Sequence, residues 1–567
     1  MRRFSLHRVA ITLTLLLALS SLATAEQPPV NLDSTRPRSH WDKIQTALDR
    51  QLLTPEQGLI YSAIALFEPQ RLPQTFTGSG LGKCGTPVLA ALEARWWDLS
   101  AQSRELLGVW PVAAGRRGLT RAESRPALSG AEHTFATEHF LVHYTLTGAD
   151  AIPNTDSDTN GIPDYADQIG LALEYSRASE LGHPLNWLEP PSDALTDPVS
   201  PSYDVYVQDI PVQGLTYPEA IIGDNEHSAD TIEPFARSSY ISLNNQLPTD
   251  ILSVTIAHEY NHAIQFGYNA AAEGFDARRW LMEGTATWME DQVFPDVDDN
   301  IGYLPRLFAA PDRSLAHPDN HYASWLLFQY IEEHGGGNST IRGAWERSVP
   351  MTGEFSAQVI GQALQAAGFT FRAAFASFCA ANLVLVPCEL SPGPLCYEDA
   401  LAYRHQAGSS FVEGSVTLGI GESVYLPPDG VQPLSCDATS AIVRNLTVAA
   451  GGYAGNETMD LQGLWVVLSG LEVDAIPFPI VANPSSPDVA VSPSPGQILY
   501  IIISNLTDPR DGPISADIYG LMFSAREQVV HTSTPTPTAT TSPASTATTT
   551  LTAPPVQRIR LPLIFRG

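Results

Sequence analysis

Apolar residues recur at helical spacing in two segments near the middle of the chain. The first covers residues 249–267, with Thr249 or Asp250 as the expected N-cap and Gly267 as the expected stop. The second covers residues 276–291 and again carries apolar side chains every three or four positions. The pattern therefore predicts two consecutive helices, each with one face turned toward a core.

Three shorter segments upstream have the β-branched and aromatic composition of strands. They are residues 140–144, 203–207 and 239–243, and a helical pattern at 165–181 separates the first strand from the second. Strands and helices thus follow one another as strand, helix, strand, strand, helix. We expect an α+β domain with a mixed sheet over residues 130–410.

The flanking regions differ from this domain in composition. Residues 26–129 contain helical patterns at 41–53 and 88–107, which predicts a helical propeptide; a helical domain kept in the mature protein is the alternative. Residues 411–527 are rich in Gly, Val, Ser and Pro with short alternating apolar runs, which predicts an all-β sandwich. Proteolytic removal of the propeptide is expected in the basic stretch that contains Arg116, Arg117, Arg121 and Arg125.

The two ends of the chain carry sorting patterns. Residues 1–25 combine a basic start, an apolar run and a small-residue cleavage site, which predicts a secretory signal peptide and an extracellular protein. Residues 528–556 are rich in Ser, Thr and Pro and predict an extended linker. The apolar and basic tail at 557–567 suggests retention at the cell surface, or docking on the β domain.

Composition sets the outer limits. The chain has 567 residues, of which 44% are hydrophobic and 16% charged, so several cores in a multidomain soluble protein are expected. The net charge of -30 disfavours nucleic acid and anionic membranes as partners. Outside the signal peptide, no stretch reaches the roughly 20 apolar residues of a spanning helix, so no transmembrane anchor is expected after signal cleavage.

The first central helix carries the chemistry. It contains His258-Glu259-Tyr260-Asn261-His262, the pattern H-E-x-x-H, and histidines four residues apart lie on one helical face, where both can bind one metal ion. On the second helix, Glu283 lies on the inner face with Trp280 and Thr287. A carboxylate buried there needs a cation, so Glu283 is the expected third zinc ligand.

These residues resemble the gluzincin metallopeptidases, thermolysin and its relatives, in which a glutamate on a following helix completes the zinc site. Glu283 stands 21 residues after His262, and the segments HEYNHAIQ and WLMEGTATWMED resemble a group of secreted bacterial metalloproteases. The resemblance covers about residues 130–410. The metzincin alternative requires a histidine six residues after His262, where this chain has Tyr268.

The resemblance implies hydrolysis of peptide bonds. Zinc held by His258, His262 and Glu283 would lower the pKa of its water to about 7, and Glu259 would take the proton and pass it to the leaving amine.

Two further parts of a peptidase site are expected on the same grounds. Tyr322 is the candidate second donor to the oxyanion, although a core or cap role is as well supported. Zincins bind an extended substrate along an edge strand, and residues 239–243, directly before the motif helix, are the candidate.

Cys84 stands apart from the other cysteines. Cys379, Cys388, Cys396 and Cys436 lie together after the catalytic region and could form two disulfides with three possible connectivities. Cys84 lies in Gly82-Lys83-Cys84-Gly85, which resembles the cysteine-switch segment of secreted metalloproteases, in which a propeptide thiolate occupies the open zinc position. The alternative is a disulfide between Cys84 and one of the four.

A second metal loop is expected at residues 156–167. Oxygen ligands stand at positions 1, 3, 5, 9 and 12 and a glycine at position 6, the arrangement of an EF-hand-type calcium loop. Pro163 and an aspartate in the last position depart from that pattern, and a turn without an ion is the alternative. The candidate calcium ligands are Asp156, Asp158, Asn160, Asp164 and Asp167.

The sequence thus predicts a secreted zinc endopeptidase, made as a zymogen, that acts on protein or peptide substrates. The rival hypothesis is a surface adhesion protein that keeps a catalytically retired peptidase fold and binds its ligand through the β domain. A retired enzyme should have lost Glu259 or a ligand, and all four positions are intact.

Overall fold

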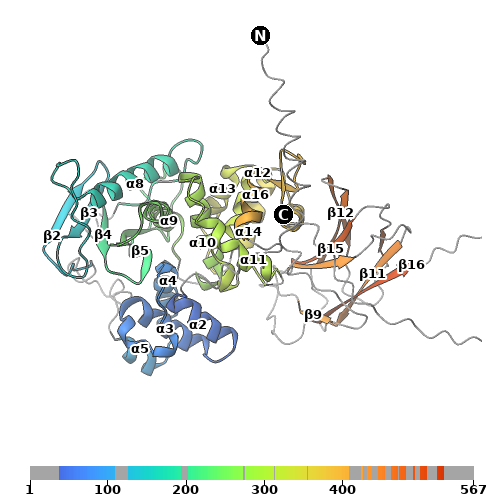
Figure 1. Ribbon diagram of the computed structural model, residues 1–567, viewed down its shortest axis with the longest axis horizontal. Helices are drawn as coiled ribbons and strands as arrows, with labels where there is room; N and C mark the ends of the chain where they lie inside the picture. The colour runs from blue at the N-terminus through green and yellow to red at the C-terminus, as the bar shows by residue number, and fades with distance from the viewer. Residues whose placement is uncertain are drawn as a thin grey trace, which may run out of the picture.

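The computed structural model describes the chain from residue 38 onward, with gaps. The described ranges are 38–108, 125–192, 202–271, 275–311, 313–353 and 355–407, followed by the C-terminal strands given below. The signal peptide (1–25), the tail (557–567) and all but residue 528 of the linker (528–556) lie outside them. The described part is a mixed α and β structure, as the α+β prediction requires (Figure 1).

A six-stranded mixed sheet supports the centre of the molecule. Its strand order is β1-β5-β6-β4-β3-β2, with β1 parallel to β5, β4 parallel to both β3 and β6, and the β5–β6 and β2–β3 pairs antiparallel. The strands are β1 (Gly82–Cys84), β2 (Glu132–Ala136), β3 (Phe140–Thr145), β4 (Tyr203–Gln208), β5 (Val212–Ile221) and β6 (Arg237–Asn244).

The prediction that residues 239–243 form the substrate-binding edge strand is wrong. They belong to β6, which lies between β4 and β5. The strand next to the sheet edge is β5, which the sequence pattern did not reveal because Pro218 argues against an internal strand. Pro218 is tolerated because the β5–β6 register shifts between Pro218 and Ile221, which marks an irregularity there.

Three long helices pack beside this sheet. They are α8 (Asp164–Leu181), α9 (Thr249–Tyr268) and α10 (Phe275–Val293), and α9 contacts β5, β6, α8 and α10. The expected caps of α9 are wrong: Pro248 occupies the N-cap without a side-chain cap, and Gly267 lies inside the helix. Gly267 serves packing, since a Cβ there would lie 2.8 Å from Asn225 Nδ2.

Further helices extend the core beyond α10. Single helical turns are η4 (Asn300–Tyr303) and η5 (Pro318–Asn320). The helices are α11 (Leu304–Ala309), α12 (Trp325–His334), α13 (Asn338–Ser348), α14 (Ser356–Ala366), α15 (Phe371–Val384) and α16 (Ala400–Ala407). Within the described residues no single helix is long and apolar enough to cross a membrane, whereas α14 and α15, bent by 99°, meet that criterion only together.

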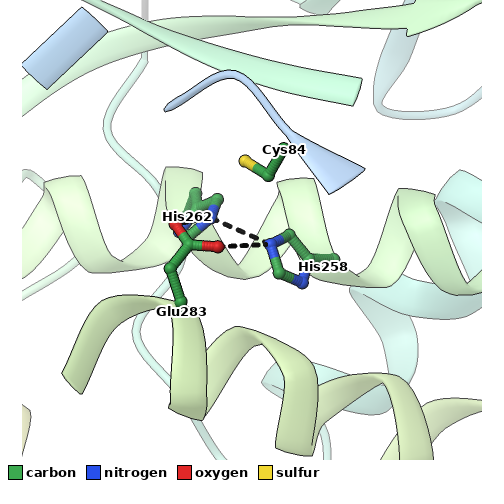
Figure 2. A group of neighbouring side chains, drawn as sticks. All are labelled: Cys84, His258, His262 and Glu283. Atoms are coloured by element: carbon green, nitrogen blue, oxygen red, sulfur yellow. Dashed lines mark hydrogen bonds and ion pairs between the residues drawn. The ribbon is translucent and has the colours of Figure 1, made fainter. Parts of the chain in front are cut away.

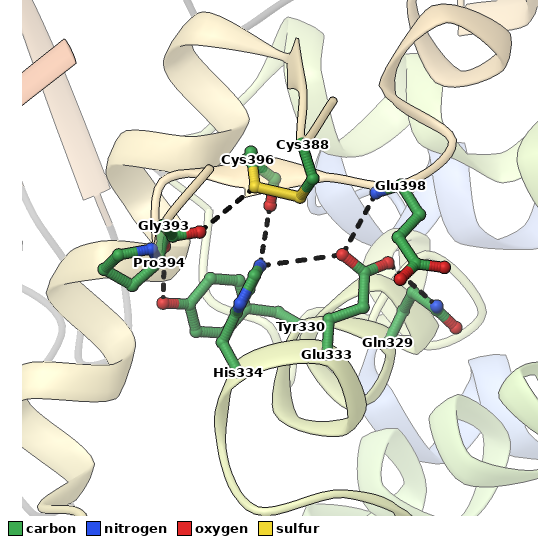
Figure 3. Close-up of a disulfide and its surroundings, with 9 residues drawn as sticks. All are labelled: Gln329, Tyr330, Glu333, His334, Cys388, Gly393, Pro394, Cys396 and Glu398. Carbon is green, nitrogen blue, oxygen red and sulfur yellow. Dashed lines mark hydrogen bonds and ion pairs between the residues drawn. A yellow bond between two sulfur atoms is a disulfide. The ribbon is translucent and has the colours of Figure 1, made fainter. Parts of the chain in front are cut away.

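One disulfide closes a short loop after α15. Cys388 and Cys396 are bonded beside the paired strands β7 (Val386–Pro387) and β8 (Cys396–Tyr397), and His334 Nε2 lies 2.9 Å from the carbonyl oxygen of Cys396 (Figure 3). Cys379 is a buried free thiol. It therefore takes no part in the second disulfide that the sequence suggested.

The N-terminal helices pack on the sheet beneath β5 (Figure 1). Their apolar side chains form one cluster with sheet residues Tyr206, Val212, Leu215, Tyr217 and Tyr240. The elements are α2 (His40–Asp49), α3 (Pro55–Phe67), η2 (Pro69–Arg71), η3 (Gln74–Phe76), α4 (Thr86–Arg95) and α5 (Ala101–Leu107).

The C-terminal region contains two antiparallel four-stranded sheets, while their face-to-face packing as a sandwich stays a prediction. Ser504 Oγ lies 3.9 Å from Cys379 Sγ, so the first sheet meets α15. In sheet order its strands are β10 (Val431–Cys436), β15 (Ile498–Asn505), β12 (Leu461–Ser469) and β13 (Glu472–Pro479). The second sheet contains β14 (Val489–Val491), β11 (Asn445–Tyr453), β16 (Gly520–Gln528) and β9 (Ser423–Tyr425).

Candidate metal centre

The two motif histidines lie one turn apart on α9 and face the same point. Their Nε2 atoms are 3.1 Å apart, and both side chains are buried (Figure 2). The four-residue spacing on a regular helix produces this convergence. His258 and His262 are therefore placed as a pair of ligands for one ion.

Glu283 on α10 completes the group from the facing helix. Its Oε2 lies 3.3 Å from His258 Nε2 and its Oε1 lies 3.4 Å from His262 Nε2. Both carboxylate oxygens are buried without a hydrogen-bond donor in well-formed geometry. Buried carboxylates are costly unless a cation compensates them, so this donor set fits a metal ion.

The electrostatics of the centre favour positive charge. Burial lowers the pKa of His258, but hydrogen bonds and charges from Glu283 and Glu290 outweigh it and raise this pKa to about 10. Burial raises the pKa of Glu283, but the two histidines outweigh it and hold this pKa below its ordinary value. The cluster therefore attracts a proton or a metal cation to the same space.

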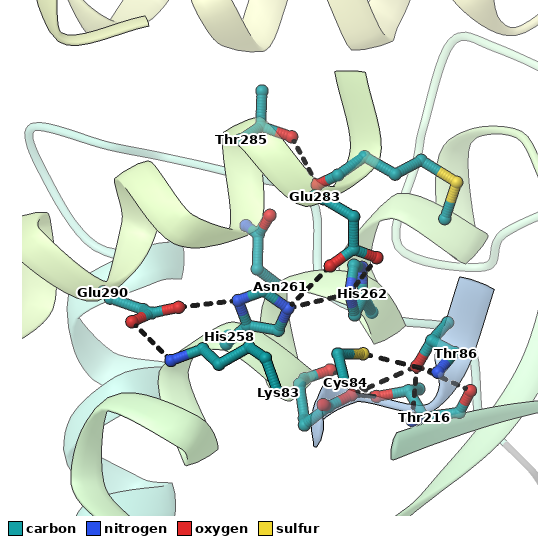
Figure 4. Close-up of polar contacts among 12 residues, drawn as sticks. Lys83, Cys84, Thr86, Thr216, His258, Asn261, His262, Glu283, Thr285 and Glu290 are labelled. Atoms are coloured by element: carbon teal, nitrogen blue, oxygen red, sulfur yellow. Dashed lines mark hydrogen bonds and ion pairs between the residues drawn. The ribbon is translucent and has the colours of Figure 1, made fainter. Parts of the chain in front are cut away.

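A second layer of side chains fixes the orientation of both imidazoles. His258 Nδ1 donates to Glu290 Oε1 at 2.7 Å (Figure 4). His262 Nδ1 donates to Gln265 Oε1 at 2.9 Å. When each ring carries its proton on Nδ1 alone, as a metal ligand must, both Nε2 lone pairs point at the centre. Such outer partners orient metal-ligating histidines and raise their basicity.

Glu259, the candidate general base, lies on the side of α9 that faces β5. Its Oε2 accepts from Thr216 Oγ1 at 2.8 Å and from Thr86 Oγ1 at 3.2 Å, while Oε1 is buried without a hydrogen-bond donor. A Cβ at Gly214 would lie only 2.7 Å from Glu259 Cγ. Glycine at this position of β5 therefore gives the base the space it occupies.

Cys84 reaches the centre from β1. Its sulfur belongs to the same buried group as His258, His262 and Glu283, whose ligand-type atoms all lie within 4.8 Å of one another. Burial, followed by the charges of Glu259 and Glu283, raises the pKa of the Cys84 thiol. The structure thus brings the sulfur of Cys84 beside the candidate ligands, and Cys84 forms no disulfide, while its role as a switch stays a prediction.

Tyr322 lies beside the group, with its ring centroid 6.2 Å from that of His258. Burial, followed by the charge of Glu283, raises its pKa. A cavity of about 470 Å³ opens between the N-terminal helices and the centre, and Cys84, Glu283 and Tyr322 are among its lining residues. Tyr322 is within the site, while its role as an oxyanion donor stays a prediction.

Several residues of the centre were not found in the sequence. Gln265 and Glu290 could have been found, because each lies on a predicted helix on the same face as a candidate ligand, three residues after His262 and seven after Glu283 respectively. Lys83, Thr86 and Thr216 had none, because strand pairing across more than a hundred residues brings them to the centre.

The candidate calcium loop is compact but held by its own hydrogen bonds. Asp156, Asp158 and Asp164 each direct an oxygen to one region, and Gly161 adopts a φ of 90°, which favours glycine. Ser157 donates to Asp164 through both its amide and its hydroxyl, and Asn160 Nδ2 donates to Asp158 and Asp167. Calcium binding here stays a prediction.

The expected processing region is described only at its end. Arg116, Arg117 and Arg121 lie outside the described residues. Arg125 forms ion pairs with Asp204 at 2.7 Å and Glu219 at 2.8 Å, and its side chain is only 5% exposed. Arg125 is therefore a poor cleavage site in the folded protein.

Comparison with known proteins adds one match. A protein-family model described as a family of unknown function (DUF6055) matches residues 242–355. This span includes His258, His262 and Glu283 and leaves out β1 with Cys84. No curated protein matches the chain. The family match therefore includes the two helices that carry the candidate ligands, and its description assigns them no activity.

Proposed function

We propose that this chain is a secreted zinc-dependent endopeptidase. The observation that carries the proposal is the convergence of His258 Nε2, His262 Nε2 and the carboxylate of Glu283 in a buried space without a compensating donor for Glu283. Two imidazoles and one carboxylate with a further position beside them are typical of catalytic zinc, whereas structural zinc sites are usually cysteine-rich and closed by four protein ligands.

The residues around the ligands suit proton transfer. Zinc bound by this set supplies Lewis-acid chemistry, which acidifies water and polarises a carbonyl group. Glu259 Oε1 is the carboxylate oxygen without a donor, so it can accept a proton, while Thr216 holds Oε2 at 2.8 Å. Tyr322 lies on the cavity side, where it can donate to a developing oxyanion.

The sheet offers a place for an extended substrate. β5 lies next to the metal centre, and β1 pairs with it through Gly82 opposite Val212 and Cys84 opposite Gly214. Main-chain groups of β5 that now pair with β1 are the groups that a peptide substrate would use by strand addition. Protein or peptide chains are therefore the substrate class that the site favours.

The first test is the general base. We expect Glu259→Gln, made in a Lys83→Ala, Cys84→Ser background that weakens the attachment of β1, to abolish cleavage of casein while the protein still binds about one zinc ion per chain. The background variant should lose its activity in a chelator and regain it with zinc. Undiminished cleavage by the Glu259→Gln protein would contradict the proposal.

We further propose that the full chain is a zymogen. Residues 82–86 close the centre at three points: the sulfur of Cys84 stands beside the metal ligands, Thr86 Oγ1 lies 3.2 Å from Glu259 Oε2, and β1 covers the edge of β5. A thiolate bound in the fourth position would exclude water from it.

Cobalt substitution tests the sulfur ligand directly. The full chain loaded with Co²⁺ is expected to show a thiolate-to-cobalt charge-transfer absorption, because the ion would be bound by Cys84. Cys84→Ser should lose that absorption and keep the weaker visible bands of a four-coordinate ion. Identical spectra for both proteins would show that Cys84 is no ligand, and would leave the peptidase proposal to its own test.

A further inference from the structure

Lys83 inserts its ammonium group into an acidic pocket next to the metal centre. Its Nζ lies 2.9 Å from Glu290 Oε2 (Figure 4). The same nitrogen lies 2.8 Å from Asp299 Oδ2, and the Lys83 side chain is 4% exposed. The ring centroid of Tyr303 lies 6.0 Å from the same nitrogen. Two carboxylates and one aromatic ring thus surround a single buried cation.

This pocket is coupled to the metal site through one side chain. Glu290 binds Lys83 with Oε2 and His258 Nδ1 with Oε1, at 2.9 and 2.7 Å. The pocket therefore lies one carboxylate away from a candidate zinc ligand. A side chain that fills the pocket must therefore come from a residue that is close in sequence to the residue beside the metal site.

Lys83 belongs to the segment that occupies the expected substrate position. It directly precedes Cys84, and both lie on β1, which runs along β5. If β1 leaves, Glu290 and Asp299 both lose the charge of Lys83. Glu290 keeps its contact with His258, but removing a positive charge from beside two buried carboxylates is costly, so the pocket is complementary to another cationic side chain.

We propose, on the basis of the peptidase function above, that Glu290 and Asp299 form a substrate subsite for a lysine side chain near the scissile bond. Lys83 occupies this subsite as a built-in ligand. An ammonium fits better than a guanidinium, because both carboxylates approach the same nitrogen atom. The enzyme would therefore select peptides with a lysine within two residues of the bond that it cuts.

The first experiment measures the subsite in the full chain without any catalysis. Lys83→Ala should lower the Tm, because it removes the ammonium group from Glu290 and Asp299 and leaves an unfilled space. Added n-butylammonium should restore the Tm in a dose-dependent way, whereas n-butanol and tetramethylammonium should not. Lys43→Ala is the matched control: Lys43 donates to the carbonyl of Thr77 in the same N-terminal region, and its variant should not respond to the amine.

A double-mutant cycle covers the case in which Lys83→Ala does not fold. Lys83→Met keeps the volume of the side chain and removes its charge. Adding Asp299→Asn to Lys83→Met should then raise the Tm, while Asp299→Asn alone should lower it. Additive effects of the two substitutions, or an amine response shared by the wild type and Lys43→Ala, would overturn the assignment of the subsite.

The second experiment reads the specificity. The Lys83→Ala, Cys84→Ser protein, in which both anchors of β1 are weakened, is offered paired peptides that carry lysine, arginine or norleucine near the cut bond. The ratio of kcat/KM for lysine over norleucine should exceed about ten and fall about tenfold in Asp299→Asn. Asp298→Asn, at the exposed neighbouring position, should keep the ratio.

The outcomes separate the two proposals. Glu259-dependent cleavage without a lysine preference would overturn the subsite and leave the peptidase function intact. A protein that cleaves none of the peptides would count against the peptidase function, and the amine experiment would still decide whether the pocket binds an alkylammonium ion. A preference for arginine over lysine would contradict the choice of ligand.

Discussion

Gln265 ties together the two helices that carry the candidate ligands. Its Oε1 accepts from His262, and its Nε2 donates to Asn261 Oδ1 at 2.8 Å and to Thr285 Oγ1 at 3.0 Å on α10. One amide therefore fixes the ring of a ligand and the distance between α9 and α10. An amide accepts a hydrogen bond through its oxygen and donates through its nitrogen, whereas a carboxylate can only accept and an ammonium group can only donate.

We predict that Gln265→Leu weakens zinc binding about 10- to 100-fold, because His262 loses the partner that orients it. Competition with a chromophoric chelator measures the affinity. Ser253→Ala, at a half-buried position on the same helix where the hydroxyl bonds only to the carbonyl of Thr249, serves as the control and should bind zinc as the wild type does. Unchanged affinity in Gln265→Leu would mean that the helix alone orients His262.

At the residue scale, local spacing made the candidate ligands predictable. His258 and His262 follow from a four-residue period, and Glu283 from the inner face of the next helix. Lys83 and Thr86 could not be found, because their partners lie 207 and 173 residues away along the chain. Such contacts depend on the order of strands in the sheet, which no local pattern contains.

Among the elements, β3 carries a buried histidine within a network of acids. His143 Nε2 lies 2.9 Å from Asp204 on β4, and His143 Nδ1 lies 2.6 Å from Glu132 on β2. Burial lowers the pKa of His143, but these two carboxylates outweigh it and raise the pKa above its ordinary value of 6.5. Protonated His143 thus links three neighbouring strands.

This pKa shift makes stability depend on pH in a definite direction. Because the pKa is raised in the folded state, the contribution of His143 is fully present below about pH 6.5 and is lost as the pH rises through the folded pKa. We predict that His143→Gln costs roughly 1–2 kcal/mol in mildly acidic buffer and less in alkaline buffer. Urea unfolding across pH measures this, with His133→Gln, exposed on β2, as the control. A cost that grows with pH would contradict the sign.

The sequence pattern predicted some of the helices and strands and missed others. The alternating strands β3, β4 and β6 and the long helices α8, α9 and α10 were expected from their periodicity. β5 was missed because of Pro218, and three-residue β1 is too short to have a pattern. The position of β5, one strand in from the edge that β1 forms, could therefore only come from the assembled sheet.

On the scale of the whole molecule, side-chain contacts hold the N-terminal helices against the sheet in addition to the covalent connection of the chain. Their apolar cluster includes Tyr206, Val212, Leu215, Tyr217 and Tyr240 of the sheet, and Arg237 pairs with Glu93 of α4 at 2.6 Å. Buried apolar area of this kind favours association whether or not the peptide chain is continuous.

We predict that a single proteolytic cut within residues 109–124 leaves both fragments associated in native buffer. Size-exclusion chromatography after brief trypsin treatment should give one peak, and denaturant should split it into two. The metal centre should stay closed in the nicked protein, with the cobalt–sulfur absorption retained. Spontaneous separation of the fragments would contradict this prediction.

Arg125 gives any such cut a defined downstream limit. Its guanidinium is bound to Asp204 and Glu219 and lies 4.9 Å from the ring centroid of Tyr240. An exopeptidase that shortens the new amino terminus would reach Arg125, and removing Arg125 requires both of its buried ion pairs to break. Heterogeneous ends would then converge just ahead of Arg125, so the start of the shortened chain would be set by its ion pairs with the sheet rather than by the site of the first cut.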